Sequence, residues 1–214
     1  MEKIITKKEV QQKINEALSS LLLNDGFKLR KKDGFIVRKN PNKTESIYFH
    51  ILNYWPLCQE VESVMFHIRF DEVENIINPI LSKHGLFNME FAKTSSTIRT
   101  WIDFNVKIDK YEDIDKFISL YMIDIKEKLL TYFEQNEDMC NINISEKSII
   151  LKQKSDLSNH IDTIMRSLIL AKLCSDTDLE ELCIKYKKLI KPFYGQEQQN
   201  FAAYDDLVRY LSKL

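Results

Sequence analysis

The sequence predicts an α+β fold: a mainly antiparallel, twisted sheet of about six strands with helices on one face, followed by a helical C-terminal region. Between residues 27 and 108, several segments alternate apolar and polar side chains, which is the period of strands with one buried face. Beyond residue 155 the apolar residues recur at helical spacing instead. We therefore expect an α+β domain at 1–136, a linker or stray strand at 137–154, and three helices within 155–214.

The first elements are an amphipathic helix and a hairpin. A helix is expected over residues 7–24, because apolar residues recur at three- and four-residue steps and Gly26 follows the run. In the next segment, FKLRKKDGFIVRK, two alternating runs flank Lys32-Asp33-Gly34, the composition of a three-residue hairpin loop. This loop pairs Leu29 with Val37. The face opposite the apolar one then carries Lys28, Arg30, Ile36 and Arg38.

A second hairpin is expected at residues 46–70, SIYFHILNYWPLCQEVESVMFHIRF, where the tripeptide Phe-His-Ile occurs twice. The alternation assigns Phe49 and Phe66, with the neighbouring aliphatic residues, to the buried face. Burying both apolar sets on one face requires paired residue numbers with an odd sum, which places His50 and His67 together on the other face. If the two residue numbers of each cross-strand pair add up to 117, His50 lies directly opposite His67.

The remaining elements follow from the same two periods. They are a helix within the stretch from Phe70 to Gly85, a short strand at 87–91, a long strand at 97–108, a long helix at 112–135, and C-terminal helices at 157–173, 179–190 and 201–211.

Composition excludes several classes of function. The formal net charge is -1, so the chain is not a globally basic nucleic-acid binder. Neither a G-x-G-x-x-G motif nor a Walker-type phosphate loop occurs, and the few glycines lie where helices and turns end. We therefore expect no cofactor. The glycines are Gly26, Gly34, Gly85 and Gly195.

Cysteine usage and hydropathy predict a cytoplasmic protein. The cysteines form no Cys-x-x-Cys pair, which favours a reduced interior over a zinc ribbon or a redox motif. The N-terminus lacks an apolar block followed by a cleavage site, and no stretch reaches roughly 18 uncharged apolar residues. Frequent Ile, Lys and Asn indicate a bacterial or phage genome. The cysteines are Cys58, Cys140, Cys174 and Cys183.

His50 and His67 are candidate metal ligands. Two imidazoles on adjacent strands can share a metal ion, but structural zinc takes four ligands and catalytic zinc takes three plus water. Cys58 or Glu60 could approach only if the connecting loop folds back over the sheet. The alternative is a pair of ordinary outer-face side chains that are packed or hydrogen-bonded.

The basic hairpin is a candidate partner-binding surface. Residues 1–43 hold 11 basic and 5 acidic side chains, a net charge of +6, whereas the rest of the chain carries -7. Such a patch could meet phosphates or an acidic protein surface, and the alternative is a solvated sheet edge protected by lysine. The candidate residues are Lys28, Arg30, Lys32, Arg38 and, in the second hairpin loop, Trp55.

The N-terminal helix, the segment NDGFKLRKKDGFIVRK and the strand ESIYFHILNYW resemble the start of small bacterial domain-of-unknown-function proteins, some of them similar to immunity proteins of toxin systems. The resemblance covers about residues 10–85. It implies an α+β domain that acts by binding protein, and it implies no catalytic residues.

We therefore predict a cytosolic bacterial protein-interaction module, an immunity-type or defence-complex subunit that acts by binding and occlusion. No acid–base pair or hydrolase motif occurs, which favours binding over catalysis. The alternatives are a nucleic-acid-associated protein that uses the hairpin at 28–38 and a metal-dependent hydrolase centred on His50 and His67. A second copy of the chain could also dock through the C-terminal helices.

Overall fold

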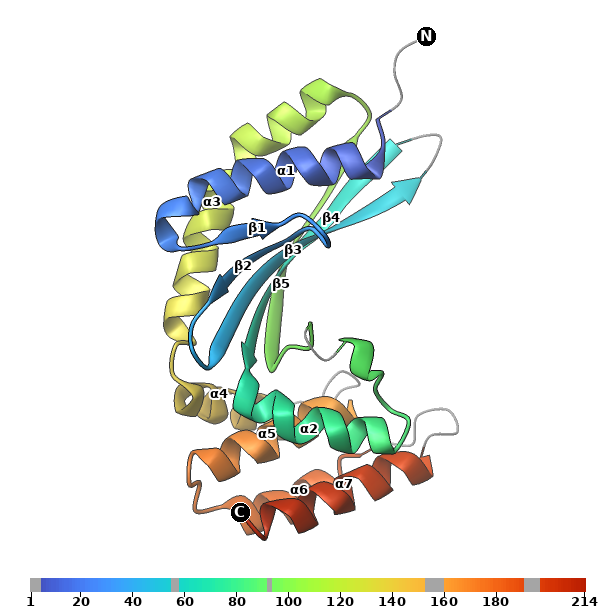
Figure 1. The fold of residues 1–214 in the computed structure, drawn as a ribbon, viewed down its shortest axis with the longest axis vertical. Coiled ribbons are helices and arrows are strands. Elements are labelled where there is room, and N and C mark those ends of the chain that lie inside the picture. The colour runs from blue at the N-terminus through green and yellow to red at the C-terminus, as the bar shows by residue number, and fades with distance from the viewer. Residues whose placement is uncertain (1–4, 55–57, 92–93, 153–159, 191–196) are drawn as a thin grey trace. The chain divides into compact units, whose positions relative to one another are not determined.

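A computed structural model describes residues 5–54, 58–91, 94–152, 160–190 and 197–214 (Figure 1). They form two compact units. Unit 1 comprises the residues up to Ile68 together with Ile98–Gln135, and unit 2 comprises Arg69–Thr97 together with the residues from Asn136 onward. Residues 69–97 thus group with the residues from 136 onward, and the expected domain boundaries stay a prediction.

Unit 1 contains a five-stranded antiparallel sheet in the order β1-β2-β3-β4-β5 (Figure 1). The predicted α+β fold is thus confirmed, with five strands where about six were expected. The expected strand at 87–91 is wrong: Met89–Phe91 form the 3-10 helix η2, where the Asn88 side chain accepts the Glu90 N–H and turns the backbone. The strands are β1 Lys28–Arg30, β2 Phe35–Lys39, β3 Lys43–Tyr54, β4 Cys58–Phe70 and β5 Ile98–Ile108.

Two helices, α1 (Lys7–Leu21) and α3 (Tyr111–Gln135), pack on one face of this sheet, which we call the covered face. We call the other face the open face. Phe49 and Phe66 are both buried on the covered face, and the ring centroid of Phe49 lies 6.4 Å from that of Phe117 in α3. The burial pattern along β3 and β4 therefore confirms the assignment of the apolar residues to one face.

Helix α1 forms as its sequence predicts. Thr6 caps its first turn in a capping box, in which the Thr6 hydroxyl accepts the Glu9 N–H and the Glu9 carboxylate accepts the Thr6 N–H. Gly26, with φ of 82°, closes the short 3-10 helix η1 (Leu23–Asp25) that follows. The apolar side chains at helical spacing that bury against the sheet are Val10, Ile14 and Leu18.

The register of the first hairpin differs by one residue from the expected one. Leu29 pairs with Ile36 and not with Val37. A shift of one residue moves every side chain of a strand to the opposite face. As a result, Arg30 lies on the open face, whereas Arg38, two residues from the buried Ile36, lies on the covered face. The two arginines therefore do not share a surface.

The loop of this hairpin explains the shift. Residues 31–34 separate the paired Arg30 and Phe35, so the loop has one residue more than expected. Gly34 has φ of 75° and its carbonyl accepts a hydrogen bond from Asn15 Nδ2 of α1 at 3.0 Å. A Cβ atom at this position would lie 3.3 Å from the same nitrogen, so glycine meets both the conformational and the steric requirement.

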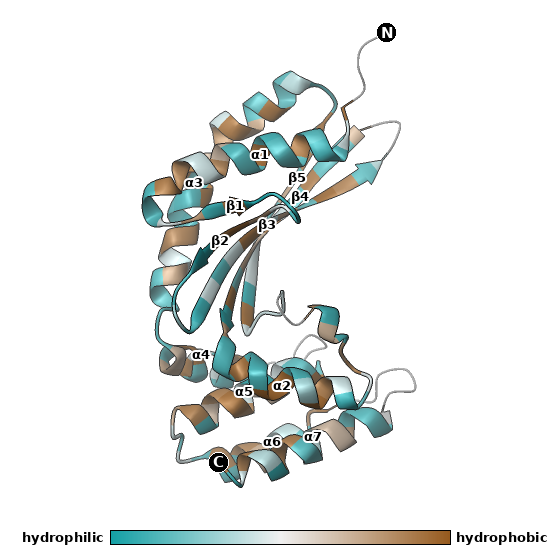
Figure 2. Cartoon of the chain, viewed as in Figure 1, coloured by the Kyte–Doolittle hydropathy of each residue, from teal (hydrophilic) through white to brown (hydrophobic). Residues whose placement is uncertain are grey.

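Unit 2 is helical, and α5 lies at its centre. Helix α5 contacts α2, α4, α6 and α7, its residues Ile164–Ala171 are all buried, and it is largely hydrophobic (Figure 2). Over the residues described, no helix of either unit has the length and hydropathy needed to cross a membrane. The helices are α2 Asp71–Lys83, α4 Met139–Lys152, α5 Ile161–Leu173, α6 Leu179–Lys187 and α7 Glu197–Leu211.

Helix α4 occupies the stretch expected to be a linker or stray strand. The apolar residues of α4 do not gather on one side of the helix, so its sequence is only weakly amphipathic. Its buried residues are Ile142, Asn143 and Ile150. Packing on α5 stabilises α4, which the local sequence pattern does not predict. The three helices expected within 155–214 are α5, α6 and α7.

A disulfide also joins α4 to α5. Cys140, at the start of α4, is bonded to Cys174, the residue after α5, with their Cα atoms 5.5 Å apart. The structure thus differs from the expectation of four reduced thiols. Cys58 and Cys183 are free thiols. The sequence could not indicate this pair, because a spacing of 34 residues carries no local signature.

Candidate functional site

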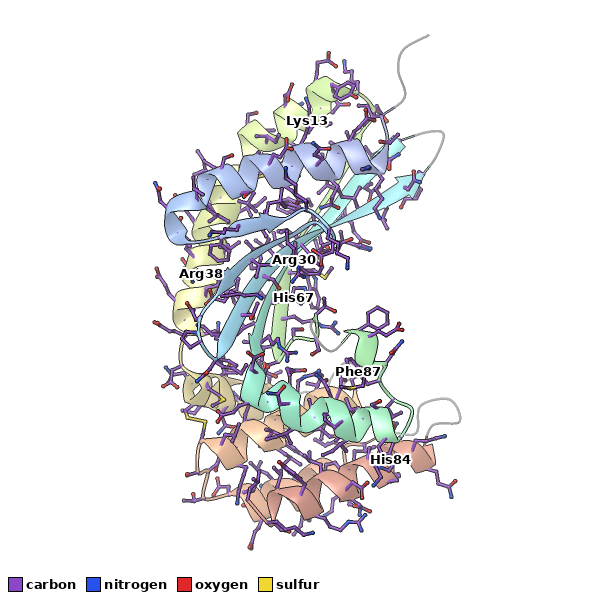
Figure 3. All side chains as sticks on the ribbon, viewed as in Figure 1. Lys13, Arg30, Arg38, His67, His84 and Phe87 are labelled. Atoms are coloured by element: carbon purple, nitrogen blue, oxygen red, sulfur yellow. A yellow bond between two sulfur atoms is a disulfide. The ribbon has the colours of Figure 1, made fainter. Side chains whose placement is uncertain are left out.

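Aromatic side chains gather on the open face of unit 1. The ring centroid of Phe35 lies 4.9 Å from that of Tyr48 and 6.2 Å from that of His67. The guanidinium of Arg30 lies over the Phe35 ring, 5.4 Å from its centroid. We call these four residues the open-face cluster; Arg30 and His67 are labelled in Figure 3. Stacked rings beside an arginine are the composition of protein-binding hot spots.

His67 is a neutral imidazole within this cluster. Both of its ring nitrogens are buried and, among the described residues, have no hydrogen-bond partner. Burial, together with the positive charge of Arg99, lowers the pKa of His67 to about 4. Arg99 is the residue paired with His67 across β4 and β5. His67 therefore contributes an aromatic surface, not a charge, at neutral pH.

The low pKa of His67 predicts acid sensitivity. The unfolded chain binds this proton at an ordinary pKa near 6.5 and the folded chain only near 4, so stability is complete above pH 6.5 and falls as the pH drops toward 4. At pH 5 the loss should be about 2 kcal/mol. Urea unfolding at pH 7.5 and pH 5 measures it. His67→Phe should lose less stability between these pH values than the wild type, and equal losses would contradict the prediction.

His50, the other predicted metal ligand, has a different partner. Its Nδ1 bonds the carboxylate of Glu62 on β4, and both side chains are partly exposed on the open face. The described contacts of His50 and His67 are thus with different residues. Within the described ranges, no three His, Cys, Asp or Glu side chains group in a way that could hold a metal ion. Direct pairing of the two histidines stays a prediction.

Arg38 is part of the packing under the covered face. Its Nε donates to the carboxylate of Glu45, and its Nη1 donates to the carbonyl of Asp25 at 3.2 Å. Its guanidinium lies 4.6 Å from the ring centroid of Phe27. Glu45 is buried and also binds Lys43 Nζ at 2.9 Å. Arg38 therefore compensates a buried carboxylate and is not presented to a partner.

The other predicted binding residues are Lys28, Arg30, Lys32 and Trp55. Lys28 and Lys32 are exposed at the first hairpin, and Arg30 is ion-paired with Asp33 at 2.8 Å. Trp55 lies outside the described residues. Of the predicted set, Arg30 is the residue that the structure brings into the open-face cluster. The sequence missed its aromatic neighbours because the expected register placed Phe35 on the opposite side from Arg30.

A second exposed aromatic residue, Trp101, lies on the open face along the last strand. It pairs with Met65 of β4 and is 51% exposed. Arg99 and Asp103, on the same face, are exposed as well. In the described part of the chain, no ion pair involves Arg99 or Asp103. The open face of β5 therefore carries a cation, an exposed ring and an anion in a row, and neither charge has an ion-pair partner among the described residues.

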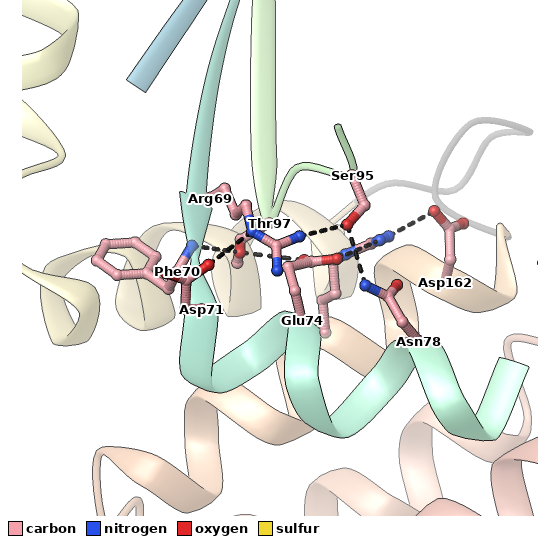
Figure 4. Close-up of polar contacts among 9 residues, drawn as sticks. Arg69, Phe70, Asp71, Glu74, Asn78, Ser95, Thr97 and Asp162 are labelled. Atoms are coloured by element: carbon pink, nitrogen blue, oxygen red, sulfur yellow. Dashed lines mark hydrogen bonds and ion pairs between the residues drawn. The ribbon is translucent and has the colours of Figure 1, made fainter. Parts of the chain in front are cut away.

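Unit 2 contains a buried ionic cluster around Glu74, shown in Figure 4. Arg166 donates from Nε and Nη2 to the two carboxylate oxygens of Glu74 at 2.8 and 3.1 Å, and from Nη1 to Asp162 at 2.6 Å. The Thr97 hydroxyl donates to Glu74 at 3.1 Å and accepts the Phe70 N–H at 2.9 Å. Burial alone would lower the pKa of Arg166, but its bonds with Glu74 outweigh this and raise the pKa.

A neighbouring set of hydrogen bonds continues this cluster. The Ser95 hydroxyl accepts from Arg69 Nη1 at 2.7 Å and from Asn78 Nδ2 at 3.1 Å, and Arg69 Nε donates to Asp71 at 2.7 Å (Figure 4). These bonds tie the end of β4 and the segment before β5 to α2. Glu74 is fully buried, and its carboxylate accepts hydrogen bonds from Arg166 and Thr97. The cluster therefore holds α2 and α5 together and does not present a reactive group to solvent.

An open groove of about 490 Å³ lies between α2 and α7. Several side chains at the groove bind one another: Lys83 Nζ and His84 Nε2 lie 2.7 and 2.8 Å from Asp206, which also binds Arg209. Hydrogen bonds from Lys83 and His84 lower the pKa of Asp206 to about 2. His84 and Asp206 are 122 positions apart in the sequence, so no local sequence pattern indicates this contact.

Comparisons with protein-family models, with curated proteins and with solved structures find no match to the chain.

Proposed function

We propose that the protein is a protein-interaction module that binds its partner with the open face of unit 1. The observation that supports this is the open-face cluster, which lies outside the helix-covered core: Phe35 stacks on Tyr48 and meets His67 edge to face, and Arg30 lies over the Phe35 ring. Aromatic rings and arginine dominate binding hot spots because they bury a large area with little loss of side-chain freedom. A stiff sheet holds them in place without a partner.

The charges around this cluster favour a protein over a nucleic acid as partner. A protein that follows a phosphate backbone needs several cations that are not already neutralised. Here Arg30 is paired with Asp33, and Arg38 is held under the covered face by Glu45. Exposed cations remain, namely Lys28 and Lys32 at the first hairpin and Arg99 on β5, but Glu62 and Asp103 give the open face both signs of charge. Mixed charge around an aromatic centre is typical of protein interfaces.

Binding in this way would act by occlusion. A partner seated on the open face would have its own contact surface covered by the sheet, with no chemical step required. This is the behaviour expected of an immunity-type or defence-complex subunit in a bacterial cytosol, as the sequence resemblance implies. We therefore propose that class of role for the chain.

The test is affinity purification of the tagged protein from its host, with mass spectrometry and a nuclease-sensitive absorbance check on the eluate. The wild type should retain a stoichiometric protein, and Arg30→Glu/Tyr48→Ala should lose at least tenfold of it, because the variant removes the cation and one stacked ring. Circular dichroism shows that the variant is folded.

The matched control reverses a charge away from the open face. Lys116→Glu changes an exposed residue of α3, on the helical side of unit 1, and should retain the partner fully. A partner that Arg30→Glu/Tyr48→Ala still retains would overturn the proposal. Nucleic acid in the wild-type eluate, lost on Arg30→Glu and at high salt, would favour the nucleic-acid alternative instead.

A further inference from the structure

The outer edge of β5 carries an inference beyond the proposed function. β1 and β5 are the two edges of the sheet; β1 has 3 residues and β5 has 11. Among the described residues, β4 is the only strand paired with β5. A long strand edge with free backbone N–H and C=O groups readily pairs with another strand, and proteins usually blunt or cover such an edge. Here it also carries an exposed tryptophan, Trp101.

The regular part of this edge is short and has a defined centre. Asn105 has φ of 54°, in the left-handed region, close to a bulge in the β4–β5 register. This kink interrupts the regular strand after Phe104, and pairing with β4 resumes at Val106. The straight segment therefore runs from Ile98 to Phe104, with Trp101 in the middle.

The side chains of this segment complement a second copy of themselves. When two copies run antiparallel with Trp101 opposite Trp101, Arg99 of each copy faces Asp103 of the other. On the open face this gives two ion pairs on either side of two tryptophans. On the covered face, Ile98 faces Phe104 and Thr100 faces Ile102. Within one copy, Arg99 and Asp103 are four residues apart along an extended strand, too far to neutralise each other.

We infer that two copies of this chain pair through their β5 edges and form one continuous antiparallel sheet. Charge complementarity selects a second copy as the occupant: Arg99 and Asp103 are both exposed and, within the described residues, neither forms an ion pair in the monomer. This inference does not rest on the open-face cluster, and it places self-association on the sheet and not on the C-terminal helices.

The test measures the mass of the purified protein by light scattering during size exclusion and by analytical ultracentrifugation. The wild type should approach twice the 25.4 kDa of the chain as its concentration is raised. In a dimer of Asp103→Arg, Arg99 of each copy would face a second arginine in the other copy. In a dimer of Arg99→Asp, Asp103 of each copy would face a second aspartate. Each variant should be a folded monomer, with at least tenfold weaker self-association.

Mixing the two single variants restores the complementary pairs and should produce a heterodimer. The double variant Arg99→Asp/Asp103→Arg should dimerise by itself, since both ion pairs are reversed. Lys107→Glu, a charge reversal on the same strand beyond Asn105, is the matched control and should dimerise like the wild type. A monomeric wild type, unchanged association of the single variants, or a mixture that stays monomeric would overturn the inference. None of these results bears on partner capture by Arg30→Glu/Tyr48→Ala.

Discussion

Phe49→Asp is expected to leave unit 1 without its folded sheet. Phe49 is fully buried in the centre of the covered face, where its ring packs against Phe117. Removing a buried phenylalanine ring costs about 3–5 kcal/mol, and a carboxylate without a partner adds several more. The sum is comparable with the roughly 5–15 kcal/mol that stabilises a typical domain. Loss of strand signal in circular dichroism and red-shifted tryptophan fluorescence would report the unfolding.

The neighbouring residue provides the control. His50→Ala changes a side chain that is 42% exposed on the open face, so it should cost less than about 1 kcal/mol. Trp101 lies in β5 of unit 1, so its fluorescence reports on this unit. If His50→Ala unfolded the protein and Phe49→Asp did not, the two faces of the sheet would be assigned the wrong way round.

The features that local sequence patterns determine were predictable. Apolar alternation in β3 and β4 assigns Phe49 and Phe66 to the core, because a strand has only two faces. Helical spacing places α1 and α3, and the turn at Gly34 follows from the need for a left-handed residue. These are all decided within about 20 residues of chain, so one sequence suffices to see them.

Features that depend on tertiary contacts were not predictable. One extra loop residue, held by Asn15 of α1, shifts the first hairpin and separates Arg30 from Arg38. The candidate site therefore changed from a basic patch to an aromatic cluster. Helix α4 forms on the surface of α5, although its own pattern is weak. Glu74 and Arg166 are 92 positions apart, and no periodic pattern in the sequence indicates that they pair.

The partnership of Glu74 and Arg166 predicts the second large effect. Arg166→Met should destabilise unit 2 by about 3–5 kcal/mol, because it leaves the fully buried Glu74 carboxylate with only the Thr97 hydroxyl as a described donor. Methionine fills much of the arginine volume, so the lost charge and hydrogen bonds dominate the effect. Because Trp101 belongs to unit 1, urea unfolding of unit 2 should be followed by the helical circular-dichroism signal or by hydrogen exchange of α2 and α5.

Two further variants separate loss of the ion pair from loss of packing. Arg209→Met removes an arginine that pairs with Asp206 at the surface, where it is 73% exposed, and should cost less than about 1 kcal/mol. Glu74→Leu/Arg166→Met removes both charges and should recover much of the stability lost in Arg166→Met, since a buried pair is costly chiefly when one partner remains alone. If the double variant were instead as unstable as the sum of the two single changes, the ion pair itself would not be the source of the effect, and side-chain packing between α2 and α5 would be.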